Sequence, residues 1–171
     1  MVELMIAIVI LTLCSGMLAS TLSATSVHRA TNYERGLAVE AARGVVEDMH
    51  NFPYASLFSR YNNNPLDDPG GLSTASGKHF AVEGLEPAAD DLDGFVGEIF
   101  IPIMGDALRE DLEDAELGMP RDLNGDMVVD GLDHQFDSIV LPVLIEIKWQ
   151  GRGGVRSFRM TTMLADCQKV D

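Results

Sequence analysis

Apolar residues run without interruption through the first part of the chain. Residues 4–27 contain no charged side chain, and residues 4–11 are almost wholly aliphatic. A helix needs about 20 apolar residues to cross the hydrocarbon core of a bilayer. The pattern therefore predicts that residues 1–27 form a membrane-spanning helix. A cleaved secretory signal fits less well, because no Lys or Arg precedes the run and the run exceeds the usual ~7 to 15 residues.

The helical pattern continues beyond residue 27, where apolar residues recur at every third or fourth position. This spacing places them on one side of a helix and the polar residues on the other. The apolar stripe comprises Ala30, Tyr33, Leu37, Ala41, Val45, Met49 and Phe52. Pro53 is expected to stop the helix. One continuous helix is thus predicted, and its amphipathic second half, residues 28–52, is expected to pack on a globular head.

Residues 53–171 have the turn signals and the alternating pattern of a small head rich in β-strands. The clearest feature is an antiparallel hairpin near the C-terminus, with a glycine-rich turn over residues 151–154. The other expected elements are strands over 78–83 and 95–103 and a short acidic helix over 106–117. The predicted fold class is α+β: a long N-terminal α-helix packed on a small antiparallel β-sheet head.

One acidic stretch of the head matches a twelve-residue calcium loop. Such loops provide oxygen ligands at positions 1, 3, 5, 9 and 12 and a backbone carbonyl at position 7. In residues 122–133 these positions hold Asp122, Asn124, Asp126, Asp130, Asp133 and, for the carbonyl, Val128. The pattern predicts a calcium site, whereas magnesium fits less well because it retains water and takes few protein ligands. The alternative is an ordinary acidic turn.

Three positions of the loop qualify this interpretation. Met127 stands where Gly normally permits a sharp turn, so its backbone is expected to adopt an unusual conformation. Asp133 replaces the usual Glu, a change that dockerin-like loops, which this segment resembles, tolerate. Val129, at the eighth position, is expected to tie the loop to the fold.

The charge balance limits the classes of partner. The chain has 12 Lys and Arg against 27 Asp and Glu, for a formal charge of −15. Most of the acidic residues lie between residues 67 and 137, and the C-terminal stretch is locally basic. An acidic surface repels phosphate backbones, so no general nucleic-acid binding is expected. Cys14 and Cys167 lie in very different environments and predict no disulfide framework.

No motif of an enzyme is evident. The four histidines form no zinc-binding run, and the chain contains no nucleophile elbow, phosphate-binding loop or dinucleotide fingerprint. The clustered carboxylates, such as Glu110, Asp111 and Glu113, are interpreted as solvated charge. We therefore expect no enzymatic activity and assign no catalytic residue.

Residues 2–11 resemble the start of mature type IV pilins and type II secretion pseudopilins. In that family Gly is followed by Phe-Thr-Leu, any residue, Glu and an apolar run; Met1 stands at the position of that Leu, and the Phe and Thr are absent. The resemblance implies that Glu3 offers its carboxylate to the N-terminal amine of a neighbouring subunit. Such a pairing is favourable because lipid makes an unpaired charge costly.

The resemblance implies a structural subunit of a type IV pilus-like or type II secretion pseudopilus filament. The expected partners are other pilin or pseudopilin subunits, the assembly machinery of a bacterial inner membrane and the lipid bilayer before assembly. The head would lie in the periplasm, or outside the cell in a surface filament. The alternative is a monomeric, single-span calcium-binding or adhesive module.

Residues 15–26, between the two halves of the helix, are rich in Gly, Ser and Thr. These residues weaken helix propensity and compete for backbone hydrogen bonds, so the stretch is expected to loosen on assembly. Small residues also favour close helix packing in membranes, which is an equal alternative.

Overall fold

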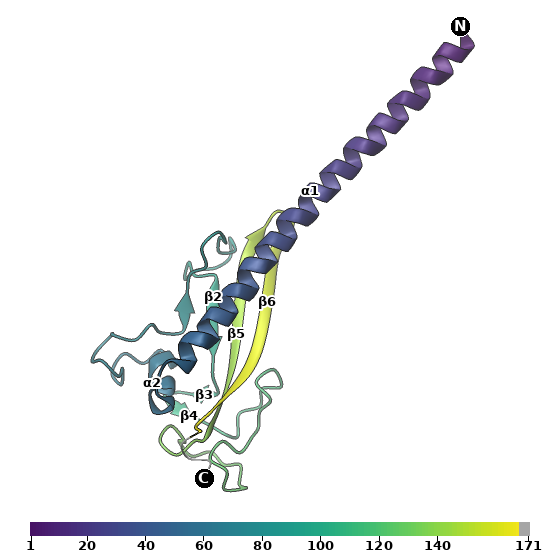
Figure 1. The fold of residues 1–171 in the computed structure, drawn as a ribbon. Helices are drawn as coiled ribbons and strands as arrows, with labels where there is room; N and C mark the ends of the chain where they lie inside the picture. Colours follow the sequence, from purple (N-terminus) through teal and green to yellow (C-terminus); the bar gives the residue numbers. More distant parts are fainter. Residues whose placement is uncertain (168–171) are drawn as a thin grey trace.

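One helix, α1 (Val2–His50), forms the spine of the structure and carries the head on its second half (Figure 1). The structure is a computed structural model that describes residues 1–167, so the last four residues of the expected head, 168–171, lie outside the described residues. The remaining elements are η1 (Tyr54–Ser56), α2 (Leu57–Tyr61), β1 (His79–Phe80), β2 (Gly97–Phe100), β3 (Ile103–Met104), β4 (Ala107–Leu108), β5 (Val140–Gly151) and β6 (Gly154–Ala165).

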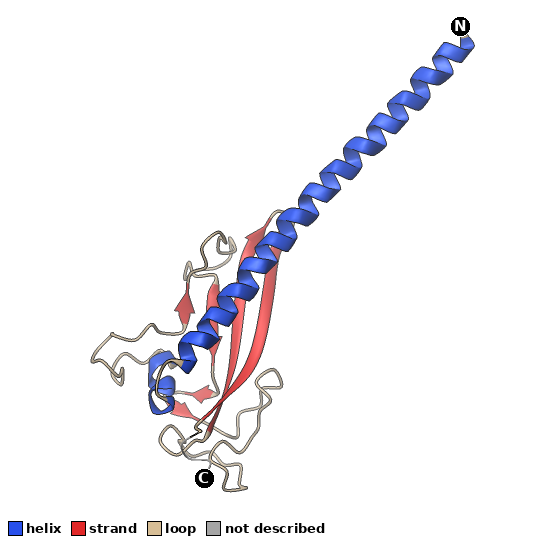
Figure 2. Cartoon of the chain, viewed as in Figure 1, coloured by secondary structure: helices blue, strands red, loops and turns tan. Residues whose placement is uncertain are grey.

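The first half of α1 projects away from the head and packs against no other part of residues 1–167 (Figure 2). Residues 1–29 are exposed, although most of them are apolar. Among the described residues α1 is the one helix long and apolar enough to cross a membrane. Its hydroxyl groups donate to carbonyl oxygens three or four residues earlier, as in the bond from Thr21 Oγ1 to Met17 O at 2.8 Å. The helix is continuous through residues 15–26.

The second half of α1 packs on the sheet, as its periodicity predicts. Ala38, Ala42 and Met49 are buried there, and the polar residues Glu40, Arg43, Glu47 and His50 are exposed. The predicted stripe is wrong in one place, because Tyr33 is 68% exposed. Ala30, Thr31 and Glu34 are partly buried at the same level, so Tyr33 lies outside the face of the helix that the sheet covers.

The main sheet has the strand order β1-β2-β5-β6, and all its neighbouring strands are antiparallel. β5 and β6 form the predicted hairpin, whose two-residue turn is closed by the pair Gly151 and Gly154. The side chains of Val143, Ile145, Ile147 and Trp149 on β5 are buried in one core with α1. Trp149 Nε1 also donates to Glu34 Oε2 of α1 at 3.2 Å. The α+β fold class is therefore confirmed.

The region before the hairpin differs from the predictions. Residues 106–117 form no helix: β4 occupies Ala107–Leu108 and turns follow it. The expected strands over 78–83 and 95–103 shorten to β1 and β2, and β3 pairs with β4 in a separate small sheet. Backbone groups of residues 102–140 are bonded mostly to distant segments, which a local pattern cannot reveal.

Candidate metal site

The predicted calcium loop lies between β4 and β5 and is held by the backbone at both ends. His134 N donates to Leu108 O at 2.9 Å, and Ile139 N donates to Leu123 O at 2.7 Å. The Leu123 side chain is fully buried, whereas Val129 is 46% exposed. The expectation that Val129 ties the loop to the fold is thus wrong, because Leu123 has that role.

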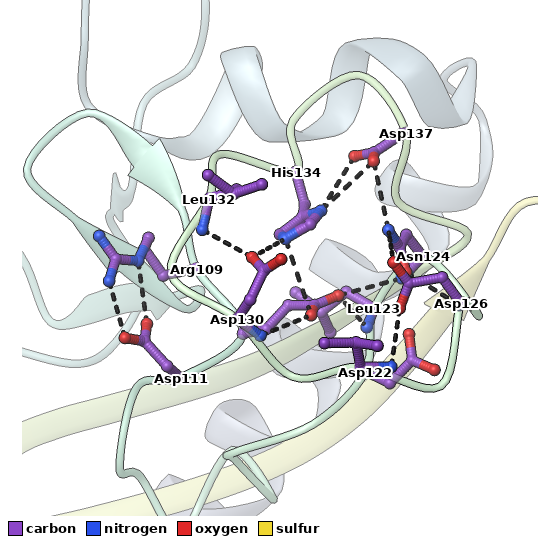
Figure 3. A network of polar contacts seen from close by, with 12 residues as sticks. Arg109, Asp111, Asp122, Leu123, Asn124, Asp126, Asp130, Leu132, His134 and Asp137 are labelled. Atoms are coloured by element: carbon purple, nitrogen blue, oxygen red, sulfur yellow. Dashed lines mark hydrogen bonds and ion pairs between the residues drawn. The ribbon is translucent and has the colours of Figure 1, made fainter.

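The first half of the loop folds around the carboxylate of Asp122 (Figure 3). Its Oδ1 accepts a hydrogen bond from Gly125 N at 2.6 Å, and its Oδ2 accepts one from Met127 N at 2.8 Å. Burial raises the pKa of Asp122, but these backbone donors outweigh burial and hold it below its ordinary value. The group therefore remains a carboxylate at neutral pH.

Met127 has the unusual backbone conformation that the sequence predicts for it. Its φ is +69°, in the left-handed region that favours glycine. The side chain is 93% exposed, so it makes little packing contribution that would offset the backbone cost. Val128, the predicted carbonyl ligand, follows at the same exposed tip of the loop.

Asn124 and Asp126 lie together at the next turn of the loop. Asn124 Nδ2 is 3.2 Å from Asp126 Oδ2 and 3.3 Å from Asp137 Oδ2, so it donates to both carboxylates. Asp126 Oδ1 in turn accepts from Val128 N at 2.7 Å. The structure thus brings Asp137, which the sequence pattern does not include, to the predicted ligands.

The last two predicted ligands occupy different surroundings. Asp130 Oδ1 accepts from Leu132 N at 2.7 Å and lies 3.1 Å from His134 Nε2. Asp133 Oδ1 accepts from Leu108 N at 3.0 Å and from Gln135 N at 3.2 Å. Asp133 therefore satisfies a backbone donor of β4, and Asp137 takes the place beside Asn124.

Glu110 is the functional residue that the sequence interpretation misses. It was expected to be solvated, but it is fully buried. Its Oε1 accepts from Leu123 N at 2.6 Å and from Asn124 N at 3.2 Å, and its Oε2 accepts from Asp130 N at 3.3 Å. One carboxylate thus joins the beginning and the end of the loop. The sequence holds no signal for this, because Glu110 stands among exposed acidic residues.

His134 is buried between three carboxylates. Its Nε2 faces Asp130 and lies 3.7 Å from Glu110 Oε2, and its Nδ1 lies 3.2 Å from Asp137 Oδ1. The protonated form of the ring can donate from both nitrogens to these carboxylates. Burial disfavours this charge, but the bond to Asp130 and the charges of Glu110 and Asp137 outweigh it and raise the pKa of His134.

Two sets of potential metal ligands therefore adjoin. Glu110, Asp130 and His134 form a mostly buried cluster, with ligand atoms within 4.8 Å of one another, that could hold a metal ion. Its mixed oxygen and nitrogen donors suit a transition metal, and His134 would have to be neutral to bind one. The loop set around Asp122, Asn124 and Asp126 offers oxygen alone, which suits calcium. Asp130 belongs to both.

Comparison of the chain with models of protein families, with curated protein sequences and with solved structures found no match. The long apolar helix on a small antiparallel sheet is compatible with a pilin-like layout.

Glu110→Ala is expected to destabilise the head by about 3 kcal/mol, because it leaves the buried N–H group of Leu123 and the partly buried N–H groups of Asn124 and Asp130 without this acceptor. Urea denaturation of the full chain in detergent micelles measures this, with fluorescence of the single tryptophan, Trp149, as the signal. Glu113→Ala removes an exposed carboxylate nearby and is the control, with no expected change. A loss below about 1 kcal/mol for Glu110→Ala would contradict the bridging role.

Met127→Gly is expected to stabilise the head by about 0.5 to 1 kcal/mol, because glycine relieves the left-handed backbone strain more than it adds unfolded-state entropy. The same denaturation experiment measures the change. Leu132→Gly removes another exposed apolar side chain of the loop at a residue without positive φ, and it should destabilise instead. Equal changes in the free energy of unfolding for the two substitutions would show that the backbone of Met127 is not strained.

Proposed function

We propose that the chain is a structural subunit of a type IV pilus-like or type II secretion pseudopilus filament, with a calcium-stabilised head. The observation that carries the proposal is the exposed half of α1. A continuous helix whose mostly apolar residues 1–29 are exposed and covered by no other described residue needs lipid or other helices around it. The head, folded on the other half, remains outside that environment.

Glu3 supports a filament rather than a simple anchor. It is the one acidic residue in the exposed half of α1 and lies in the first turn of the helix. In lipid or in a packed bundle of helices a carboxylate requires a cationic partner. The N-terminal amine of a neighbouring copy would supply this charge, as the resemblance to pilins implies.

In this proposal the chain is made in a bacterial inner membrane as a single-pass protein with its head in the periplasm. Its partners are other pilin or pseudopilin subunits, the inner-membrane assembly machinery and, before assembly, the lipid bilayer. In a surface filament the head would be extracellular. The role is structural and not enzymatic, and the acidic head gives no basis for general nucleic-acid binding.

Calcium is the proposed ligand of the head, bound by Asp122, Asn124, Asp126, the Val128 carbonyl and Asp130. The contact between Asn124 and Asp137 adds Asp137 as a candidate for the closing ligand in place of Asp133, whose Oδ1 accepts from the backbone. Neutralising several adjacent carboxylates would stiffen this part of the head.

Glu3→Ala is expected to leave the chain in the membrane fraction but reduce its incorporation into filaments at least about tenfold, because the loss of one partner strands the other charge. Filaments sheared from cells that produce the full-length chain are quantified against the membrane pool by immunoblotting. Glu113→Ala, an exposed carboxylate of the head, is the control. Unchanged incorporation would favour the monomeric anchored module.

Calcium is expected to bind the full chain in detergent micelles with a Kd of about 10⁻⁴ to 10⁻³ M, as in extracellular calcium modules. Isothermal titration calorimetry measures this. Asp126→Ala should weaken binding at least about tenfold, and Asp137→Asn should weaken it more than Asp133→Asn. Asp106→Ala, an exposed carboxylate outside the loop, is the control. Absence of calcium binding, with Asp126→Ala indistinguishable from the unmodified chain, would refute the calcium site.

A further inference from the structure

β6 leaves one long edge of the main sheet open. It pairs with β5 over twelve residues on one side and forms the end of the strand order on the other. Lys148 N and Gln150 N of β5 donate away from β6, toward Val96 O and Glu86 O. Their partners on β6 are Ser157 and Val155. In an antiparallel ladder the backbone groups of such a pair point away from each other, so those of Val155 and Ser157 point to the open side. Within residues 1–167 no other backbone segment bonds these groups. An open edge of this length is a template for another chain.

The free end of the hairpin at this edge is positively charged. Arg152 is exposed in the turn and forms no salt bridge with the described residues. Arg156 lies two residues into β6. Its side chain and the Glu34 carboxylate of α1 both lie near Gly151, at the start of the turn. Arg159, farther along, is already neutralised by Glu116 and Glu146. Arg156, like Arg152, forms no salt bridge with the described residues, so both contribute positive charge to this end, and Arg152 is the more exposed of the two.

The opposite edge of the sheet is negatively charged at the same level. The segment 83–93, between β1 and β2, carries exposed carboxylates at Glu83 and Glu86 that form no salt bridge with the described residues. Asp90 and Asp93 of the same segment are also exposed, but Asp90 is paired with Lys148 at 3.2 Å and Asp93 lies 2.9 Å from His79. Gln150 N donates to Glu86 O at 2.8 Å, and Gln150 pairs with Val155 of β6. The acidic segment and the basic hairpin end thus lie at the same height along the sheet, on either side of β5. Figure 1 shows β2 and β6 on these two sides.

The number of strands determines how copies can associate. In a sheet of four antiparallel strands the two edge strands, β1 and β6, run in opposite directions. Copies placed side by side with parallel α1 helices therefore bring β6 against the β1 edge of the next copy as antiparallel strands. An antiparallel, two-fold β6–β6 pairing would instead point the two α1 helices in opposite directions.

We propose that the β6 edge of one copy, with Arg152, docks against the acidic segment 83–93 of the next copy. The inference rests on the proposed filament and names its contact between heads. The two surfaces differ, so the contact is heterologous and can repeat without closing, as a filament requires. Because the opposite charges lie at the same height along the sheet, they determine how two neighbouring heads align. They also disfavour contacts between two β6 edges or between two acidic segments.

Disulfide cross-linking between two tagged copies tests the contact. Both copies are full length, carry Cys14→Ser and Cys167→Ser, and are incorporated together in lipid vesicles; one has Ser157→Cys and the other Ala81→Cys, both at exposed positions. Because each copy has one cysteine, every disulfide joins two molecules. The expected product is the mixed 157–81 dimer. A predominance of 157–157 dimers would overturn the proposal.

Charge exchange tests the electrostatic part. Arg152→Glu in the first copy should reduce the mixed dimer about fivefold, and Glu86→Arg in the second copy should restore it. Both residues are exposed, and Trp149 fluorescence verifies that each variant is folded. Glu113→Arg is the control for an added positive charge elsewhere and should restore nothing. Insensitivity to Arg152→Glu, or restoration by Glu113→Arg, would refute the proposed pairing.

Comparing the Glu3→Ala incorporation experiment with the 157–81 cross-linking experiment separates this inference from the filament proposal. If Glu3→Ala reduces filament incorporation in cells but no 157–81 dimer forms, the contact between heads is wrong and the filament proposal remains. If the 157–81 dimer forms and Glu3→Ala leaves incorporation unchanged, the heads associate side by side and the role of Glu3 in the filament is wrong.

Discussion

The rest of the structure depends on the packing of the second half of α1 against β5. Ala38 and Ala42 have no exposed surface, and such small side chains let the helix approach the sheet closely. The space is filled by residues such as Ile145 and Ile147, each of which contributes about 2 kcal/mol on burial. This contact uses only the second half of the helix, so the core of the head is complete without the first half. The first half is then left with an apolar surface that nothing else in the described part of the chain covers.

That exposed half is suited to an environment without water. Several of its hydroxyl side chains donate to carbonyl oxygens of their own helix: those of Thr12, Ser20, Thr21, Thr25 and Ser26. Such bonds satisfy each hydroxyl donor without water or another helix. These Ser and Thr residues weaken helix propensity in solution, but transferring their bonded hydroxyl groups into lipid costs little free energy. Loosening on assembly and close packing of small residues both remain compatible with this helix.

The sequence predicts the features that depend on local periodicity. The end of α1, the hairpin and the unusual backbone at Met127 all follow from spacing within a few residues, and the structure agrees. The mistakes concern residues whose environment depends on distant segments. Glu110 resembles its exposed acidic neighbours until Leu123 and Asp130 fold back onto it, and no local pattern encodes that return. The short acidic helix over 106–117 fails for the same reason.

The geometry around Glu110 also couples the calcium loop to the buried cluster through Asp130. Asp130 Oδ1 accepts from Leu132 N and lies beside His134, while its backbone N–H is held by Glu110. A cation in the loop and a cation in the buried cluster would both draw on the Asp130 carboxylate. A positive charge at either place would also repel protonated His134, which already lies among three carboxylates. The two ligand sets thus share the Asp130 carboxylate, so a cation bound at one place would change the charge available to a cation at the other.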